Sequence, residues 1–313
     1  MKTHELRGSF FIMMATVFWS LSAVSAKYMF KSRPLAPLLI VQARMTIAAL
    51  VLFVLLFAFS RHLLVIGRRH VPYFFVHGAF GMALVQLAYF TAVREGTVSS
   101  AIFLQYTAPL LAAVYYAVRH RRLPPAYVIS SLLVAMCGSG LLLLGSGTIA
   151  TTSLGLAAGL MSAVMMAFYA IYGAHGVKLY SSWTALFWGL LSGSVVLFFV
   201  QPPWVIRGMN LVSTDWLFLV FMALLGTLIP FGLFLYGLKQ VPALQAILIS
   251  MLEPVLASAF AALFIREYLT PIQIMGGALI VVAVAWVELK RAQESQIRLP
   301  QPNARTQTAH KSA

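Results

Sequence analysis

Long apolar stretches follow one another along almost the whole chain, separated by short polar or Pro/Gly-containing segments. A membrane-spanning helix needs roughly 20 consecutive apolar residues, and this pattern predicts ten such helices. Their predicted ranges are 8–30, 35–59, 72–94, 97–118, 125–146, 153–175, 183–201, 215–238, 242–264 and 270–289. We therefore expect an all-α polytopic membrane protein with no room for a separate soluble domain.

Two of the apolar stretches, 145 positions apart, each carry a proline near the middle, Pro109 and Pro254. Proline removes one amide hydrogen and frees the carbonyl four residues earlier, here that of Gln105 or Ser250. In lipid a freed carbonyl must be satisfied by protein or water, and paired interrupted helices in two halves of a transporter mark its binding site. We expect helix interruptions at Pro109 and Pro254 beside a central site, although proline is also common in membrane helices that have no such role.

The repeat extends beyond these two stretches, because Gly81 pairs with Gly226 and Arg94 with Lys239 at the same offset. This predicts two five-helix halves, residues 8–146 and 153–290. Since five is odd, the second half enters the membrane in the opposite orientation, which makes the halves inverted repeats.

The chain ends are polar. Residues 1–7 are expected to form a cytoplasmic N-terminus, and residues 291–313, which are basic and nearly free of bulky apolar side chains, a disordered cytoplasmic tail. The first apolar run, from Phe10 to Ala26, is longer than the 7–15 apolar residues of a signal peptide. We therefore expect it to be retained as a helix.

The composition agrees with a membrane protein: 61% of the 313 residues are hydrophobic and 9% are charged. The net charge of +15 would suggest nucleic-acid binding in a soluble protein, but here it is better explained by Lys and Arg in cytoplasmic loops. With the N-terminus inside, about 15 Lys and Arg fall on the cytoplasmic side and about six outside. The predicted location is the bacterial inner membrane, with both termini cytoplasmic.

Two ionisable residues lie deep within predicted spans, where a charge costs roughly 2.5–3.5 kcal/mol on insertion scales. Arg44 is in the second span, and Glu253 directly precedes Pro254 in the ninth. Arg44 could hold an anionic group or pair with helix carbonyls. Glu253 could bind a cationic group, exchange a proton, or serve as a structural carboxylate bonded across a helix interface.

Polar and aromatic residues form stripes at helical spacing on several spans. Such stripes would suit a cavity for a small amphipathic molecule, and small-residue helix packing is the alternative explanation. The predicted substrate-binding residues are Trp19, Ser22, Arg44, Gln86, Tyr89, Gln105, Tyr169, Ser250 and Glu253.

Enzyme signatures such as H-E-x-x-H and G-x-S-x-G are missing, and Asp215 is the only aspartate. We expect no catalytic residues, cofactor or metal. Two alternatives stay open: an intramembrane hydrolase that uses Ser139 or Ser146 with a histidine, and a non-transporting membrane scaffold or sensor.

The chain resembles the EamA-type members of the drug/metabolite transporter superfamily over roughly residues 8–290. The resemblance depends on the order and spacing of several short motifs. These are Trp19-Ser20, Pro37 with Arg44, YFTAV at 89–93, TAP at 107–109, LEPV at 252–255, REYLT at 266–270 and Gly276-Gly277. In the first half RHRRL at 119–123 replaces the family's glycine- and glutamate-rich turn, so a role of that turn is expected only in the second half.

The resemblance implies a carrier of ten helices in two five-helix repeats, for small metabolites and often for export of amino acids or related amphipathic compounds. We therefore expect a secondary transporter that works by alternating access, with a small-molecule substrate and the lipid bilayer as partners and no nucleic acid. Two further partners stay open: protons as the coupling ion, and a second copy of the chain in a homodimer.

Overall fold

The computed structural model describes residues 2–32, 35–145, 151–202, 211–265 and 269–297, except for the side chains of 2–5, 27–32, 265 and 294–297. Ten helical spans in these residues are long and apolar enough to cross a membrane, which confirms the predicted fold class. The described residues contain no β-strand.

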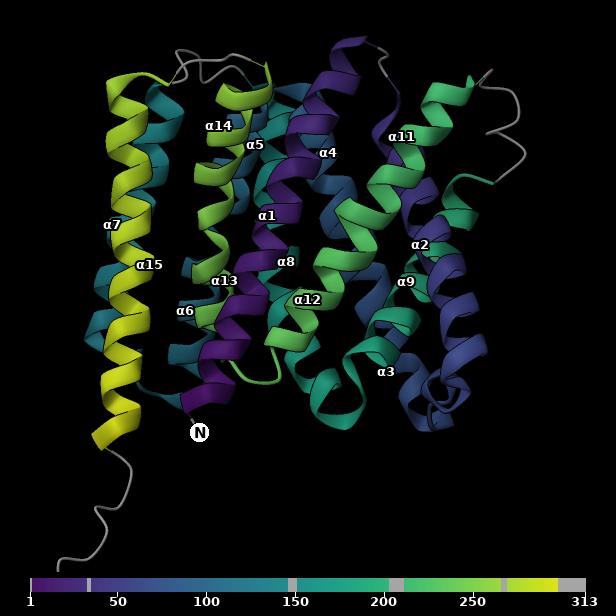
Figure 1. Cartoon of the computed structure of the whole chain (residues 1–313), viewed down its shortest axis with the longest axis horizontal. Coiled ribbons are helices and arrows are strands. Elements are labelled where there is room, and N and C mark those ends of the chain that lie inside the picture. The colour runs from purple at the N-terminus through teal and green to yellow at the C-terminus, as the bar shows by residue number, and fades with distance from the viewer. Residues whose placement is uncertain (1, 33–34, 146–150, 203–210, 266–268, 298–313) are drawn as a thin grey trace, which may run out of the picture.

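The spans form one bundle of roughly upright helices (Figure 1). In chain order the spans are α1 (Lys2–Ser32); α2 (Pro37–Phe59); α3 (Val71–Val76), η3 (His77–Leu84) and α4 (Val85–Glu95); α5 (Val98–Gln105) and α6 (Ala108–His120); α7 (Ala126–Gly145); α8 (Ser153–Leu179); α9 (Ser182–Val200); α11 (Ser213–Ala223), η4 (Leu224–Leu228) and α12 (Ile229–Gly237); α13 (Ala243–Ser250) and α14 (Leu252–Ile265); and α15 (Pro271–Ile297). Two short 3-10 turns, η1 (Arg61–Leu64) and η2 (Arg68–His70), connect α2 to α3.

The first and last helices extend further than predicted. Helix α1 already begins at Lys2, within the segment assigned to the polar N-terminus, and α15 continues to Ile297, within the segment assigned to the tail. Lys, Arg, Glu and Gln favour helix almost as well as apolar residues do, so polar sequence lets a helix continue into water. The remainder of the tail lies outside the described residues.

The two halves of the chain pack mainly against each other. Helix α7 of the first half lies along α15 of the second, α4 packs on α8, α1 on α12 and α14, and α2 on α9 (Figure 1). Each half therefore supplies only part of the bundle's core.

The third and eighth spans each contain a π-helical segment, η3 and η4, at matching positions of the two halves. A π-helical turn adds one residue to a helix and often occurs at functional sites. The pair includes Gly81 and Gly226, which the repeat in the sequence had matched, but the sequence pattern did not predict the change in helix type.

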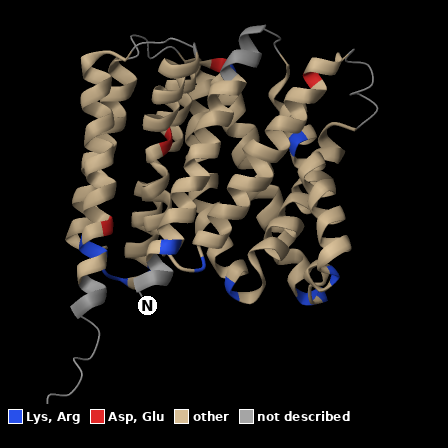
Figure 2. Ribbon diagram, viewed as in Figure 1, with Lys and Arg blue, Asp and Glu red and all other residues tan. Residues whose placement is uncertain are grey.

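Helix α1 begins, and helix α15 ends, at the same end of the bundle, called here the N-terminal end (Figure 1). Lys and Arg gather at this end (Figure 2). Helices α1 and α12 touch there through Gly8 and Gly237, where an added Cβ on Gly237 would lie 2.8 Å from the Gly8 carbonyl oxygen. The Arg291 side chain also donates to Ser9 at 3.3 Å and to the Gln240 carbonyl at 3.2 Å, which connects α15 to α1 and to the turn after α12.

Candidate functional site

Two spans are interrupted at matching positions in the two halves. Helix α5 ends at Gln105 and α6 begins at Ala108, while α13 ends at Ser250 and α14 begins at Leu252. Each break lies just before a proline, Pro109 or Pro254, which cannot donate to the preceding turn. The breaks lie near the middle of the membrane-spanning bundle.

A cavity of about 60 Å³, called here the central cavity, lies beside both breaks. It is lined by Trp19, Ser22, Ala23, Arg44, Val85, Gln86, Tyr89, Phe90, Gln105, Tyr106, Met166, Phe231 and Glu253. Seven of the nine predicted substrate-binding residues are therefore found together around one cavity. The structure does not bring Tyr169 and Ser250 to its lining.

Ser250 and Tyr169 are both fully buried next to the site. The Ser250 hydroxyl donates to the Ala246 carbonyl of its own helix at 2.9 Å, so the serine turns away from the cavity. The Tyr169 ring packs against Phe231 and Phe234 at 5.4 and 5.6 Å between ring centres, and Trp19 packs on the same two rings from α1. Trp19 and Phe231 of this aromatic cluster line the central cavity, whereas Tyr169 and Phe234 lie behind them.

Arg44 enters the cavity from α2 and is held by η4. Its Nε donates to the Thr227 hydroxyl at 2.6 Å, and its Nη2 donates to the Gly226 carbonyl. The guanidinium also lies over the Phe90 ring, 5.1 Å from its centre, a favourable cation–π position. Of the two predicted roles for Arg44, the contact with helix carbonyls is present, and the side chain additionally borders the cavity.

The Gly226 carbonyl is available to Arg44 because Pro230 follows it four residues later and has no amide hydrogen to donate. Gly226 also lacks a side chain, and an added Cβ there would lie 3.1 Å from the Arg44 Nη2. The predicted interruptions, at Pro109 in the fourth predicted span and Pro254 in the ninth, did not include Pro230. Counting back four residues from every proline within a span would have found this carbonyl.

Glu253 reaches the cavity from the first turn of α14 and bridges to the other half of the chain. Its Oε2 accepts a hydrogen bond from the Tyr106 hydroxyl at 2.6 Å, and its backbone carbonyl accepts one from Ser20 at 3.0 Å. Glu253 is 6% exposed and Tyr106 is 2% exposed. Tyr106 was missed from the sequence, although it stands three residues before Pro109 at the break itself.

The central cavity contains one basic and one acidic side chain that do not contact each other directly. Arg44 and Glu253 both line it, yet the part of the chain that the structure describes shows no ion pair between them. Each is instead held by neutral groups, Arg44 by η4 and Glu253 by Tyr106. Both side chains therefore border the same cavity without a direct ion pair between them.

Two further polar atoms at the cavity lack partners. The Gln86 Nε2 donates to the Met82 carbonyl at 3.1 Å, but its Oε1 has no hydrogen-bond partner among the described residues, and the same holds for the Tyr89 hydroxyl. Buried polar atoms are nearly always hydrogen-bonded. Their position at a cavity indicates that a ligand or water supplies the missing bonds.

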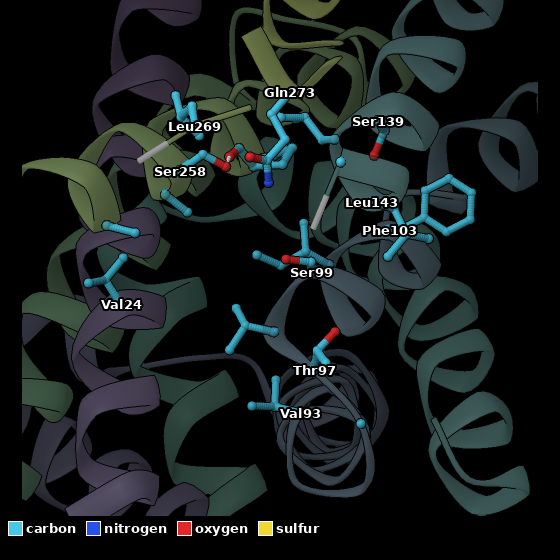
Figure 3. A pocket seen from close by; sticks show the side chains of 18 of the residues that line it. Val24, Val93, Thr97, Ser99, Phe103, Ser139, Leu143, Ser258, Leu269 and Gln273 are labelled. Atoms are coloured by element: carbon cyan, nitrogen blue, oxygen red, sulfur yellow. Dashed lines mark hydrogen bonds between the residues drawn. The ribbon is translucent and has the colours of Figure 1, made fainter. Parts of the chain in front are cut away.

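A second, larger cavity of about 730 Å³, called here the vestibule, lies between the central cavity and the end of the bundle opposite the N-terminal end. Figure 3 shows side chains converging on it from α1, α5, α7, α14 and the start of α15. Among those labelled are Val24, Val93, Thr97, Ser99, Phe103, Ser139, Leu143, Ser258, Leu269 and Gln273. The vestibule was not predicted from the sequence.

The structure offers little to the hydrolase alternative. Ser139 lines the vestibule, whose described lining includes no histidine, and Ser146 lies outside the described residues. No group of three or more His, Cys, Asp or Glu side chains that could hold a metal ion occurs in the described part of the chain.

Comparisons with known proteins give a consistent result. A structure titled "Crystal structure of protein" superposes with a TM-score of 0.72 at 20% identity, over 90% of this chain and 96% of that one, which shows the shared fold. The "Uncharacterized inner membrane transporter YicL" of Salmonella typhimurium is 23% identical over 289 residues, covering 90% of this chain and 95% of that protein. The "Uncharacterized transporter YcbK" of Bacillus subtilis is 25% identical, covering 91% and 93%.

The profile of the EamA-like transporter family matches residues 6–144 and again residues 153–289. These two matches cover nearly all of the chain between the polar ends, and they agree with the ten-span bundle and with the names of the relatives. The protein is therefore a multi-pass membrane transporter that belongs to the EamA-like transporter family.

Proposed function

We propose that the protein exports a small zwitterionic metabolite, such as an amino acid or a related amphipathic compound, across the bacterial inner membrane. The observation that supports this most directly is the pair of opposite charges, Arg44 and Glu253, at one central cavity. A carboxylate and an ammonium group on one ligand match these charges, and Trp19, Phe90 and Phe231 offer apolar walls to the rest of the molecule.

Transport proceeds by alternating access between two inverted halves. The contacts of Gly8 with Gly237 and of Arg291 with Ser9 hold the N-terminal end together, while the vestibule lies toward the other end. The Lys and Arg residues at the N-terminal end support a cytoplasmic location for it (Figure 2). On this assignment the described conformation faces away from the cytoplasm.

Glu253 couples transport to protons. A carboxylate at membrane depth can load a proton on one side and release it on the other, and its counterpart at the same offset in the first half is the neutral Ala108. The two breaks are therefore chemically unequal. Passive uniport, in which Glu253 only accepts the bond from Tyr106, is the competing mechanism.

The test uses the full-length protein purified in detergent and a panel of neutral amino acids, organic amines and organic carboxylates. We expect zwitterions to raise the midpoint of thermal unfolding, because a ligand that binds only the folded state stabilises it by mass action. Compounds that do so should then exchange across proteoliposomes containing the protein. If no compound on the panel either stabilises the protein or exchanges, the scaffold or sensor alternative is preferred.

A further inference from the structure

The central cavity and the vestibule are separated by a very thin partition. Along α1, Ala23 lines the central cavity and the next residue, Val24, lines the vestibule. Along α14 the same holds for Glu253 and Pro254. The two cavities are therefore adjacent at α1 and α14, and the pairs Ala23–Val24 and Glu253–Pro254 between them are called here the partition.

The two cavities differ in the size of the ligand that they can hold. Ligand sites typically measure about 300–1,000 Å³, a range that includes the vestibule at 730 Å³ but not the central cavity at 60 Å³. The volume of the vestibule is thus large enough for a small metabolite, whereas that of the central cavity is not. To reach Arg44 a metabolite must move side chains of the partition.

One buried hydrogen bond joins the two halves of the chain at this partition. The Tyr106 hydroxyl, at the break between α5 and α6, donates to the Glu253 carboxylate at 2.6 Å, just past the break between α13 and α14. Ser20 holds the Glu253 backbone from α1. The bond therefore connects the two helix interruptions.

The vestibule has ligand-binding groups of its own. The hydroxyls of Ser99 and Ser139 make no hydrogen bond within the described part of the chain, and Arg94 is the only charged residue of the described lining. A zwitterion entering here is drawn by its carboxylate toward Arg94. Its ammonium group reaches Glu253 only past the partition, because Glu253 lines the central cavity and not the vestibule.

We propose that the vestibule is a first binding subsite for a ligand with an ammonium group, and that Tyr106 is the gate between this subsite and the central cavity. The proposal rests on the proposed transport function. In the described conformation the Tyr106 hydroxyl donates to the Glu253 carboxylate. An arriving ammonium group takes over this carboxylate through a charge-assisted hydrogen bond, which releases Tyr106 and opens the partition.

The experiment measures passage through the gate with thiol reagents and needs no knowledge of the natural substrate. In the full chain carrying Cys137→Ala, one cysteine is introduced either at Ala23 in the central cavity or at Ser99 in the vestibule. Each is reacted in detergent with the cationic reagent 2-aminoethyl methanethiosulfonate or with neutral methyl methanethiosulfonate. The second-order rates of modification are compared with and without Tyr106→Phe.

We expect Tyr106→Phe to raise the rate at Ala23→Cys by about tenfold or more, because a hydrogen bond to a charged group no longer has to open. The rate at Ser99→Cys should not change, since this position lies in front of the gate. Ala257→Trp, which fills the bottom of the vestibule, should slow modification at Ala23→Cys if the path runs as proposed.

Glu253→Gln distinguishes the effect of the hydrogen bond to Tyr106 from the effect of the negative charge. The amide oxygen can still accept from Tyr106, so the neutral reagent should react at Ala23→Cys at the parent rate, while the preference for the cationic reagent disappears. Equal rates at Ala23→Cys in the parent and in Tyr106→Phe would overturn the proposal, as would a lack of effect of Ala257→Trp. Since these rates do not depend on any transported compound, they test the gate even if the metabolite panel gives no substrate.

Discussion

At the scale of single residues, Glu253 is the side chain whose chemistry matters most for energy coupling. Glutamine at this position keeps the size and the acceptor for Tyr106 but cannot titrate. We expect Glu253→Gln protein to fold and to exchange substrate across proteoliposomes. We also expect it to lose accumulation against a gradient when a pH difference is imposed, measured with labelled substrate. Accumulation equal to that of the parent would exclude Glu253 as coupling group, and no pH-driven transport in the parent would favour uniport.

Gln86 and Ser250 form a matched pair for testing the cavity. Both were predicted to bind substrate, but only Gln86 lines the central cavity, whereas Ser250 bonds to its own helix. Gln86→Met should weaken substrate binding about tenfold through the loss of one polar contact of about 1.4 kcal/mol. Ser250→Ala should leave affinity unchanged. Titration of thermal unfolding with the substrate measures both; the reverse order of effects would place the binding site elsewhere.

Helical periodicity was enough to predict which polar residues share a face, and hence most of the central cavity. Trp19, Gln86 and Glu253 could be grouped because each is a polar or aromatic residue on an apolar helix near mid-span. Tyr106 could not be found in this way, because its orientation depends on the unwound turn before Pro109. Tyr169 lies on such a stripe but packs in an aromatic cluster beside the cavity, and its role in substrate binding stays a prediction.

At the scale of elements, η4 shows how a proline and a glycine prepare a site for a charged side chain. Pro230 leaves the Gly226 carbonyl without a helical donor, and Arg44 supplies one. The apolar pattern correctly predicted that one span covers α11 to α12. The same pattern did not predict the π-helical turn, because the residues before and after this turn in the chain are also apolar.

This arrangement predicts a rescue. Arg44→Leu should destabilise the protein by about 1–3 kcal/mol, because a buried carbonyl loses its partner. Adding Pro230→Ala supplies a backbone amide for the same carbonyl, so the double variant should recover part of the loss, while Pro230→Ala alone should not stabilise the parent. Thermal unfolding of the four purified proteins closes this double-mutant cycle. Simple additivity would mean that Arg44 and Pro230 act on different groups.

At the scale of the whole molecule, the order of the ten spans could be read from the sequence because every span is longer than its connections. The vestibule could not, since it forms where α7 and α15 lie beside α5 and α14, a matter of packing between distant segments. The location of the two ends of the bundle relative to the cell is predicted from charge alone.

That location is open to a direct measurement. Cysteines introduced at Ser60 and at Thr151, in chains carrying Cys137→Ala, lie at opposite ends of the bundle, because three spans separate them. In intact cells an impermeant thiol reagent should label only the cysteine at Thr151, and the cysteine at Ser60 should react only after the cells are opened. Labelling of both in intact cells would contradict the ten-span topology, and the opposite pattern would place the termini outside.

The packing of each half against the other has a consequence for how the protein can be made. Because α7 finds its partner in α15 and α4 in α8, a polypeptide of one half alone would leave its inner faces without a partner. We expect chains 1–148 and 149–313 to be degraded when each is expressed alone, and to assemble when they are expressed together from separate genes, as judged by co-purification through a tag on one of them. Stable accumulation of a single half would show that it can satisfy these faces by itself or with a second copy. The covalent connection between the halves would then serve to fix their ratio and relative insertion, while the specificity of assembly is carried by the helix surfaces themselves.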